Sequence, residues 1–199
     1  MQALPQIGQI ALFPLSTVLF PGGLLPLRIF ETRYVDMVGH CLRTDEVFGV
    51  VLIRGGSETS SAVDVAPVGT SARIVDFQRL ADGLLGLLCR GERRFAIQQR
   101  SQQSDGLNRA TVEWLPETPT ALAEEFRALL PVLRRVLSEM DNIGRFVQAN
   151  YEDACWVGYR LAELLPLEPA SQQRLLEMHD PHERLRLLAP LIETGAQPD

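Results

Sequence analysis

The sequence contains no lysine, and all 19 of its basic residues are arginine. A phosphate-binding loop of the GxxxxGK[ST] type, a Schiff-base site and a serine–lysine nucleophile pair each require a lysine amine. The absence of lysine therefore excludes these three chemistries. The sequence also contains no protease segment. It therefore predicts neither an ATPase motor nor a peptidase.

Cysteine is also scarce. The three cysteines, Cys41, Cys89 and Cys155, stand far apart and never at CxxC spacing. This pattern signals neither a disulfide framework nor a zinc site. Free thiols fit a reducing compartment, so we expect a cytoplasmic protein.

Long uninterrupted apolar runs and concentrated positive charge are both missing. The most apolar stretch, Ile10 to Phe30, is broken by three prolines, and the N-terminus lacks a basic region and a small-residue cleavage site. We therefore expect neither a signal peptide nor a membrane span. The formal net charge of −6 argues against non-specific binding to nucleic acid.

What is present reads as an ordinary globular chain of 199 residues, 46% hydrophobic and 22% charged. Its N-terminal part, Ile10 to Leu42, predicts two short strands followed by a helix. The prolines in both strands cannot donate to a ladder, so we expect sheet edges or strand starts there. Thr32 is the predicted N-cap. Helical spacing predicts one buried stripe on this helix, formed by Tyr34, Val35, Val38, Cys41 and Leu42.

The middle of the chain predicts strands joined by hairpins. Val47 to Ile53 is a near-continuous apolar run typical of a central buried strand, and a polar loop, Gly55 to Ser61, follows it. Asp82-Gly83 and Asp105-Gly106 predict hairpin turns, and Gly91 predicts a further turn. Successive hairpins indicate a mostly antiparallel, curled sheet or partly closed barrel.

The pattern changes near residue 118, after the proline-rich segment Pro116 to Pro119. Leu122 to Met140 carries an amphipathic stripe of helical period that Pro131 should kink. Asp153 to Leu165 predicts a second helix. Asp180 followed by Pro181 is the N-cap and first position of a last helix.

Several motifs occur in the same order as in a known family. They are Phe13-Pro14-Leu15, Phe20-Pro21-Gly22, Pro26-Leu27, Val68 to Ile74, Cys89 to Phe95, Val112 to Leu115 and Leu175 to Leu185. The chain resembles the amino-terminal substrate-recognition domain of Lon protease, which also occurs in cereblon and in small stand-alone proteins. The resemblance implies an α+β fold with a mostly antiparallel PUA-like pseudo-barrel, residues 1–117, followed by a C-terminal helical bundle, residues 118–199. It also implies that the chain ends where the family's recognition region hands over to its motor.

No group of residues predicts catalysis, a metal or a cofactor. His179 and His182 lie near Glu183, but no third ligand has suitable spacing, so a capped helix with surface histidines is favoured. The serines of the polar loop lack a Gly-x-Ser-x-Gly elbow. A small hydrolase with an unrecognised site stays open only as a second alternative.

The hypothesis that we favour is a non-catalytic module that binds exposed apolar segments of unfolded polypeptides or a partner protein. Its contact residues combine apolar side chains with alternating charges near the start of the first helix, as in an apolar patch rimmed by charge. The residues are Leu24, Leu25, Arg28, Phe30, Glu31, Arg33 and Tyr34.

The first alternative is an RNA-binding module, because the implied fold is related to RNA-binding barrels. Arg90, Arg93 and Arg94 form a local basic cluster beside Phe95. Glu92 interrupts the cluster and the whole chain is acidic, so we expect nucleic acid to be an unlikely partner. A homodimer is also open, because an exposed strand edge can pair with its copy across a two-fold axis.

Overall fold

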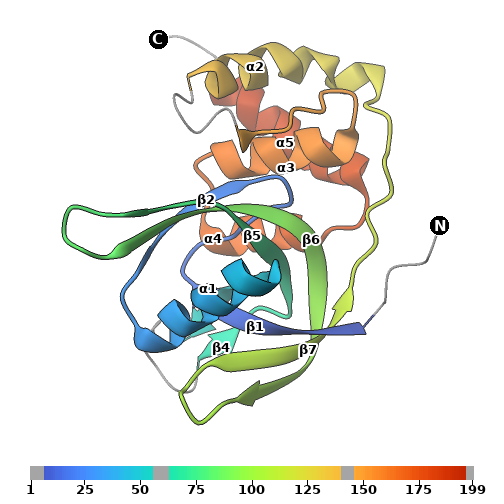
Figure 1. Ribbon diagram of the computed structural model, residues 1–199. Coiled ribbons are helices and arrows are strands. Elements are labelled where there is room, and N and C mark those ends of the chain that lie inside the picture. The colour runs from blue at the N-terminus through green and yellow to red at the C-terminus, as the bar shows by residue number, and fades with distance from the viewer. Residues whose placement is uncertain (1–6, 56–62, 140–145, 196–199) are drawn as a thin grey trace. The chain divides into compact units, whose positions relative to one another are not determined.

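The computed structural model describes residues 7–55, 63–139 and 146–195 (Figure 1). The chain forms two compact units, Met1–Pro116 and Glu117–Asp199. Of the elements in these described ranges, the strands and one helix lie in the first unit, and the other helices lie in the second. Most of the polar loop predicted after Gly55 lies outside the described residues.

The first unit is built on a seven-stranded, mostly antiparallel sheet. Its elements are β1 (Ile7–Leu15), β2 (Leu24–Ile29), α1 (Thr32–Thr44), β3 (Phe48–Gly55), β4 (Asp64–Val65), β5 (Val68–Arg79), β6 (Leu85–Gln102) and β7 (Asn108–Trp114). The strand order is β1-β7-β6-β5-β3-β4, and β2 pairs with β6. A parallel pairing of β1 with β3 closes the circuit β1-β7-β6-β5-β3. The α+β class predicted from the sequence is confirmed.

Proline positions follow the pairing of the strands. The ladder of β1 with β7 runs from Ile7 to Leu12, and the ladder with β3 runs from Leu12 to Leu15. Pro14 therefore lies where β1 has one partner, although β1 as a whole is not an edge strand as predicted. Pro26 lies in β2, which pairs with β6 alone among the described strands. A residue without an N–H is tolerated at both places.

Helix α1 covers one of two apolar clusters in the first unit. Its buried side chains are Tyr34, Met37, Val38 and Cys41. The predicted stripe was wrong for Val35 and Leu42, which are 42% and 43% exposed. Thr32 is the first helical residue and not the N-cap, since the extended residue before the helix is Glu31.

The hairpin turns occur where Asp-Gly pairs predict them. Gly83 and Gly106 have φ angles of 86° and 84°, in the region that glycine enters without steric cost. The turn predicted at Gly91 is wrong, because β6 continues through this residue. Gly91 instead forms two backbone hydrogen bonds with the Gly22-Gly23 turn. The Gly22 N–H donates to the Gly91 carbonyl at 2.8 Å, and the Gly91 N–H donates to the Gly23 carbonyl at 2.9 Å.

The second unit consists of a 3-10 helix, η1 (Glu124–Leu129), and helices α2 (Leu130–Ser138), α3 (Ala154–Leu164), α4 (Pro169–Glu177) and α5 (Pro181–Gly195). Pro131 does not kink one long helix, because α2 starts at Leu130 and proline suits its first turn. Helix α3 is buried on nearly every side, so it lies at the centre of this unit. No helix in the described part of the chain is long and apolar enough to span a bilayer.

Candidate functional site

The predicted polypeptide contacts lie on β2 and at the start of α1, a region that we call the β2–α1 surface. Phe30, between the two elements, is 65% exposed and is the most exposed large apolar side chain among the described residues. Leu24 is half-buried and Arg28 is exposed. Arg28 forms an ion pair with Asp82 in the turn between β5 and β6. The structure thus leaves the Phe30 ring open, two residues along the chain from an arginine held in an ion pair.

Two charged residues of the β2–α1 surface serve to hold its shape. Arg33 Nη2 lies 2.7 Å from Glu31 Oε2, and Arg33 Nη1 donates to the carbonyl of Gly106 at 2.9 Å. The guanidinium therefore ties the start of α1 to the turn between β6 and β7. Sequence reasoning missed Asp82 and Gly106 as partners, because both are distant in the chain.

Tyr34 and Leu25 lie beneath the surface. The Tyr34 side chain is 4% exposed, and its ring packs against Phe13 with the centroids 4.1 Å apart. Leu25 is half-buried and packs against the same apolar cluster. The expectation that Tyr34 contacts a ligand is therefore corrected: its ring supports the surface from the core, because the α1 stripe at residues 34, 37, 38 and 41 points inward.

The arginine cluster does not form an open basic surface. Arg94 is buried at 1% exposure. Arg93 lies over the Trp114 ring at 4.6 Å, and Arg90 lies 3.9 Å from Glu92. Glu92 also accepts from Arg73 Nε at 2.6 Å. Since neighbouring rings and carboxylates engage these guanidinium groups, the geometry gives no support to a phosphate-binding role.

His182 has structural partners, and the three cysteines are buried. His182 Nε2 lies 3.1 Å from the Ala121 carbonyl, and its ring stacks on Phe126. Cys41, Cys89 and Cys155 are all buried. Burial, aided by the nearby Cys41, raises the pKa of the Cys89 thiol to about 12. A thiol with so high a pKa is a poor nucleophile near neutral pH.

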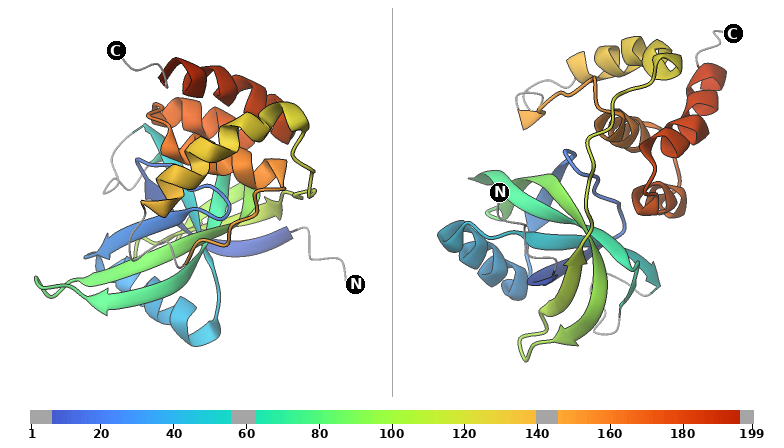
Figure 2. Two further views of the ribbon diagram at one scale, coloured as in Figure 1. Left: turned by 90° about the horizontal axis from the view of Figure 1, so that it is seen from above. Right: turned by 90° about the vertical axis from the view of Figure 1, so that its right-hand side faces the viewer.

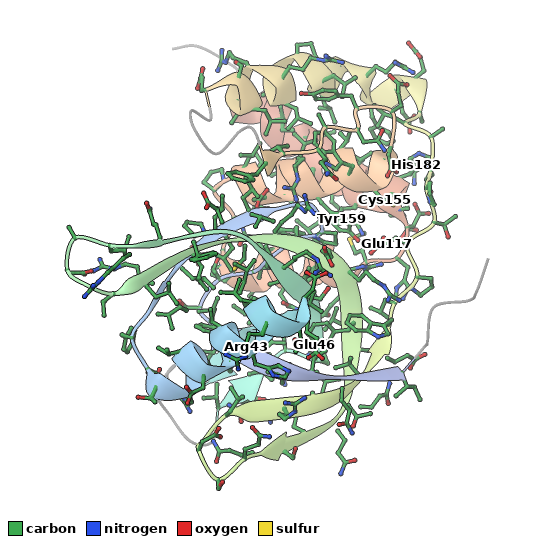
Figure 3. All side chains as sticks on the ribbon, in the orientation of Figure 1. Arg43, Glu46, Glu117, Cys155, Tyr159 and His182 are labelled. Carbon is green, nitrogen blue, oxygen red and sulfur yellow. The ribbon has the colours of Figure 1, made fainter. Side chains whose placement is uncertain are left out.

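The second unit contains a polar chain that sequence reasoning missed. The Tyr159 hydroxyl donates to Glu117 Oε1 at 3.0 Å (Figure 3). The same hydroxyl accepts from Arg184 Nη2 at 3.3 Å. Arg184 is fully buried and also donates to the carbonyls of Leu175 and Met178. These hydrogen bonds tie Glu117 to α3 and α5, although Arg184 Nη1 is buried without a hydrogen-bond partner. Among the residues that the structure describes, no three His, Cys, Asp or Glu side chains gather where they could hold a metal ion.

Comparison with known proteins identifies the family. A model of the ATP-dependent protease La (LON) substrate-binding domain matches residues 9–194. The chain belongs to this family. A solved structure of a Lon N-terminal domain protein from Xanthomonas campestris is 39% identical, covers 96% of this chain and 99% of its own, and superimposes with a TM-score of 0.74. The N-terminal domain of Mycobacterium avium complex Lon protease, at 20% identity, covers 96% of this chain and all of its own, and its TM-score of 0.62 supports the shared fold.

Curated relatives are longer than this Lon substrate-binding domain chain. Lon protease 1 of Sorangium cellulosum is 33% identical over 189 residues, which are 87% of this chain and 23% of the relative. Lon protease of Cytophaga hutchinsonii is 29% identical over 191 residues, which are 92% of this chain and again 23% of the relative. The chain thus spans about a quarter of the length of these relatives.

Proposed function

We propose that this chain is a non-catalytic module that binds exposed apolar segments of polypeptides at the β2–α1 surface. The family match supports a substrate-recognition role, since its description is that of a substrate-binding domain. The observation that carries the proposal is Phe30, a large aromatic side chain held 65% exposed between two structured elements. An exposed ring at a fixed place is suited to serve as an anchor.

The surroundings of Phe30 fit this use. Arg28 with Asp82 and Arg33 with Glu31 provide charges near an apolar ring, as at the rim of an interface. Full burial of a phenylalanine side chain contributes about 1.5–3 kcal/mol, which is roughly a 10- to 100-fold gain in affinity. One or two such anchors supply about 1.5–6 kcal/mol, less than the roughly 8 kcal/mol of a micromolar complex, so binding through them alone is weak and reversible.

The finer architecture belongs to the same proposal. The closed circuit of pairings in the first unit supports its description as a PUA-like pseudo-barrel, and the helices around α3 support a helical bundle. Three buried free thiols fit a reducing cytoplasm. We infer that recognition resides in the first unit.

The test is a titration of the full chain into a fluorescently labelled, permanently unfolded polypeptide, followed by anisotropy. Phe30→Ala should weaken binding about tenfold or more. Phe77→Ala is the matched control, because Phe77 is also a phenylalanine of the first unit, 57% exposed, on another strand. We expect this control to stay within twofold of the parent.

Two results would contradict the proposal. One is an absence of saturable binding by the parent chain. The other is an equal loss of affinity for both phenylalanine variants, which would place the anchor elsewhere or nowhere. The labelled polypeptide should also keep its intact mass after prolonged incubation, and cleavage abolished by a single substitution would make the chain an enzyme.

A further inference from the structure

In the described part of the chain, the distal half of β5 has a strand partner on one side only. β3 pairs with β5 only through Phe48–Val50 and Thr70–Ala72. From Arg73 to Arg79, β5 pairs with β6 alone among the described strands. This part belongs to the β5–β6 hairpin, which projects beyond the other strands of the first unit (Figures 1 and 2). An unpaired row of backbone groups is a template for another strand.

The hydrogen bonds show which groups face outward. The Leu80 N–H donates to the Leu84 carbonyl across the hairpin, so Leu80 faces β6. Backbone groups alternate in direction along a strand, so Phe77 and Arg79 present theirs on the outer side. The Phe77 N–H accordingly bonds to the carboxylate of its own neighbour, Asp76 Oδ1, at 2.9 Å. That carboxylate stands where the carbonyl of an added strand would lie.

The edge of β5 is better suited to pairing than that of β2. β2 also has one open side, but Pro26 interrupts its row of donors. β5 has no proline from Val68 to Arg79. It also carries Phe77, which is 57% exposed. A bulge between Ile74 and Asp76 interrupts the ladder with β6, so the regular part of this edge runs from Asp76 to Arg79.

We propose that the β5 edge pairs with the β5 edge of a second copy of this chain, antiparallel, with the two-fold axis at Phe77. In this register Phe77 faces Phe77 of the copy, and their outward N–H and C=O groups bond reciprocally. Asp76 faces Gln78 of the copy twice, once on each side of the axis. The Phe77 N–H exchanges the Asp76 carboxylate for a carbonyl, and the Asp76 carboxylate accepts from the Gln78 amide.

The sequence of the edge selects this register. In an antiparallel pair of strands, side chains directly opposite each other point to the same face of the sheet. The alternative registers of this pair therefore differ by two residues. A shift toward the N-terminus sets Asp76 against Asp76 of the copy, and like charges directly opposite are destabilising. A shift toward the C-terminus sets the carboxylate against Leu80. Of these three registers, the one centred on Phe77 sets each Asp76 carboxylate opposite a Gln78 amide.

Sedimentation velocity of the full chain over a range of concentrations tests the proposal. The mass should rise from 22.2 kDa toward twice that value as concentration increases. Gln78→Asp sets two carboxylates opposite each other at both places and should weaken association at least tenfold. The double variant Asp76→Gln with Gln78→Asp restores an amide opposite a carboxylate, and it should recover association to within about threefold.

The double variant separates an effect on association from an effect on folding. Both variants carry exposed substitutions on one strand, and their circular dichroism spectra can be compared to show that they are folded. Phe77→Cys places two thiols at the axis, and mild oxidation should give a covalent dimer. A parent chain that stays at 22.2 kDa at every concentration overturns the proposal. So does a dimer that Gln78→Asp leaves intact, or one that the swap fails to recover. Phe30→Ala should leave the association unchanged, which separates this proposal from polypeptide binding.

Discussion

Among the described residues, three arginine side chains are buried almost completely: Arg94, Arg160 and Arg184. Desolvation lowers the pKa of Arg160, while its partner Glu163, 2.7 Å away, raises it in part. Arginine starts from so high a pKa that it keeps its charge in such a place. Its fork of donors also lets Arg184 reach two carbonyls and the Tyr159 hydroxyl at once. In a chain without lysine, arginine supplies both the surface charge and these internal ties.

At Gly91 the chain has no room for a side chain. A Cβ there would lie 2.2 Å from the carbonyl oxygen of Phe20. Gly91→Ala should therefore force the Gly22-Gly23 turn off β6 and lower the free energy of unfolding by about 1–3 kcal/mol or more. Gly39 is the control, because a Cβ there meets only the flexible end of Arg43 at 3.3 Å. Gly39→Ala should raise the free energy of unfolding by up to about 1 kcal/mol, since alanine has a higher helix propensity than glycine.

Urea unfolding of both glycine variants, followed by circular dichroism, measures these changes. Equal stability of Gly91→Ala and the parent would show that the turn does not dock on β6 as described.

The Cys89 thiol should make the protein sensitive to alkali. Burial raises its pKa in the folded state from about 9 to about 12, so the folded chain favours the protonated thiol. The associated stability is fully present below about pH 9 and is lost as pH rises toward 12, by at most about 1.4 kcal/mol per pH unit. Cys89→Ala should show a shallower loss over this range in urea unfolding measured at pH 8 and pH 10. Identical slopes for the variant and the parent would contradict the assignment.

Among the elements, α5 has the best-defined start. Asp180 Oδ1 accepts from the backbone N–H groups of His182 at 2.7 Å and of Glu183 at 3.2 Å, as the sequence predicted. These bonds, that of Glu183 first, hold the pKa of Asp180 below its ordinary value. Stability from this carboxylate is therefore present above its unfolded-state pKa and is lost as pH falls through the folded one.

Asp180→Ala should lower the midpoint of thermal unfolding near neutral pH, because two helix donors lose their acceptor. Asp180→Asn should keep most of the cap and lose only its dependence on acid pH. Differential scanning calorimetry at pH 7 and at pH 3 compares the two variants. A neutral effect of Asp180→Ala at pH 7 would mean that α5 does not need this cap.

Strand β6 shows how a long element joins several others. It pairs with β2, β5 and β7 over its 18 residues. The sequence suggested two shorter strands because Gly91 looked like a turn residue. The glycine is needed for a close backbone approach from a distant turn, and no local pattern distinguishes that use from a turn.

In the whole molecule, the chain passes from one unit to the other within three residues. The Leu115 N–H donates to the Arg94 carbonyl in the first unit at 3.0 Å. Glu117 accepts from Tyr159 in the second. We propose that each unit folds as a domain, with Glu117 belonging to the helical one and not, as predicted, to the first.

Fragments starting at residue 117 and at residue 118 test this boundary. The fragment 117–199 should unfold at a higher temperature than 118–199, because loss of the acceptor leaves a buried tyrosine hydroxyl poorly satisfied, at a cost of about 1–3 kcal/mol. Thermal unfolding by circular dichroism measures the difference. Glu117→Gln in the longer fragment should keep most of the effect, since its amide oxygen also accepts. Equal stability of the two fragments would place the boundary where the sequence put it.

The sequence alone determined the class of fold, the family, the hairpins at Asp-Gly pairs and the cap at Asp180. These features are encoded locally, by periodicity, turn chemistry and short motifs. Only the tertiary structure decided that Tyr34 is buried while Phe30 is open, that Arg33 bonds to Gly106, and that the distal half of β5 pairs with β6 alone among the described strands. Those facts depend on which distant segments pack together, and burial and pairing are properties of the packed chain that no single stretch of sequence contains.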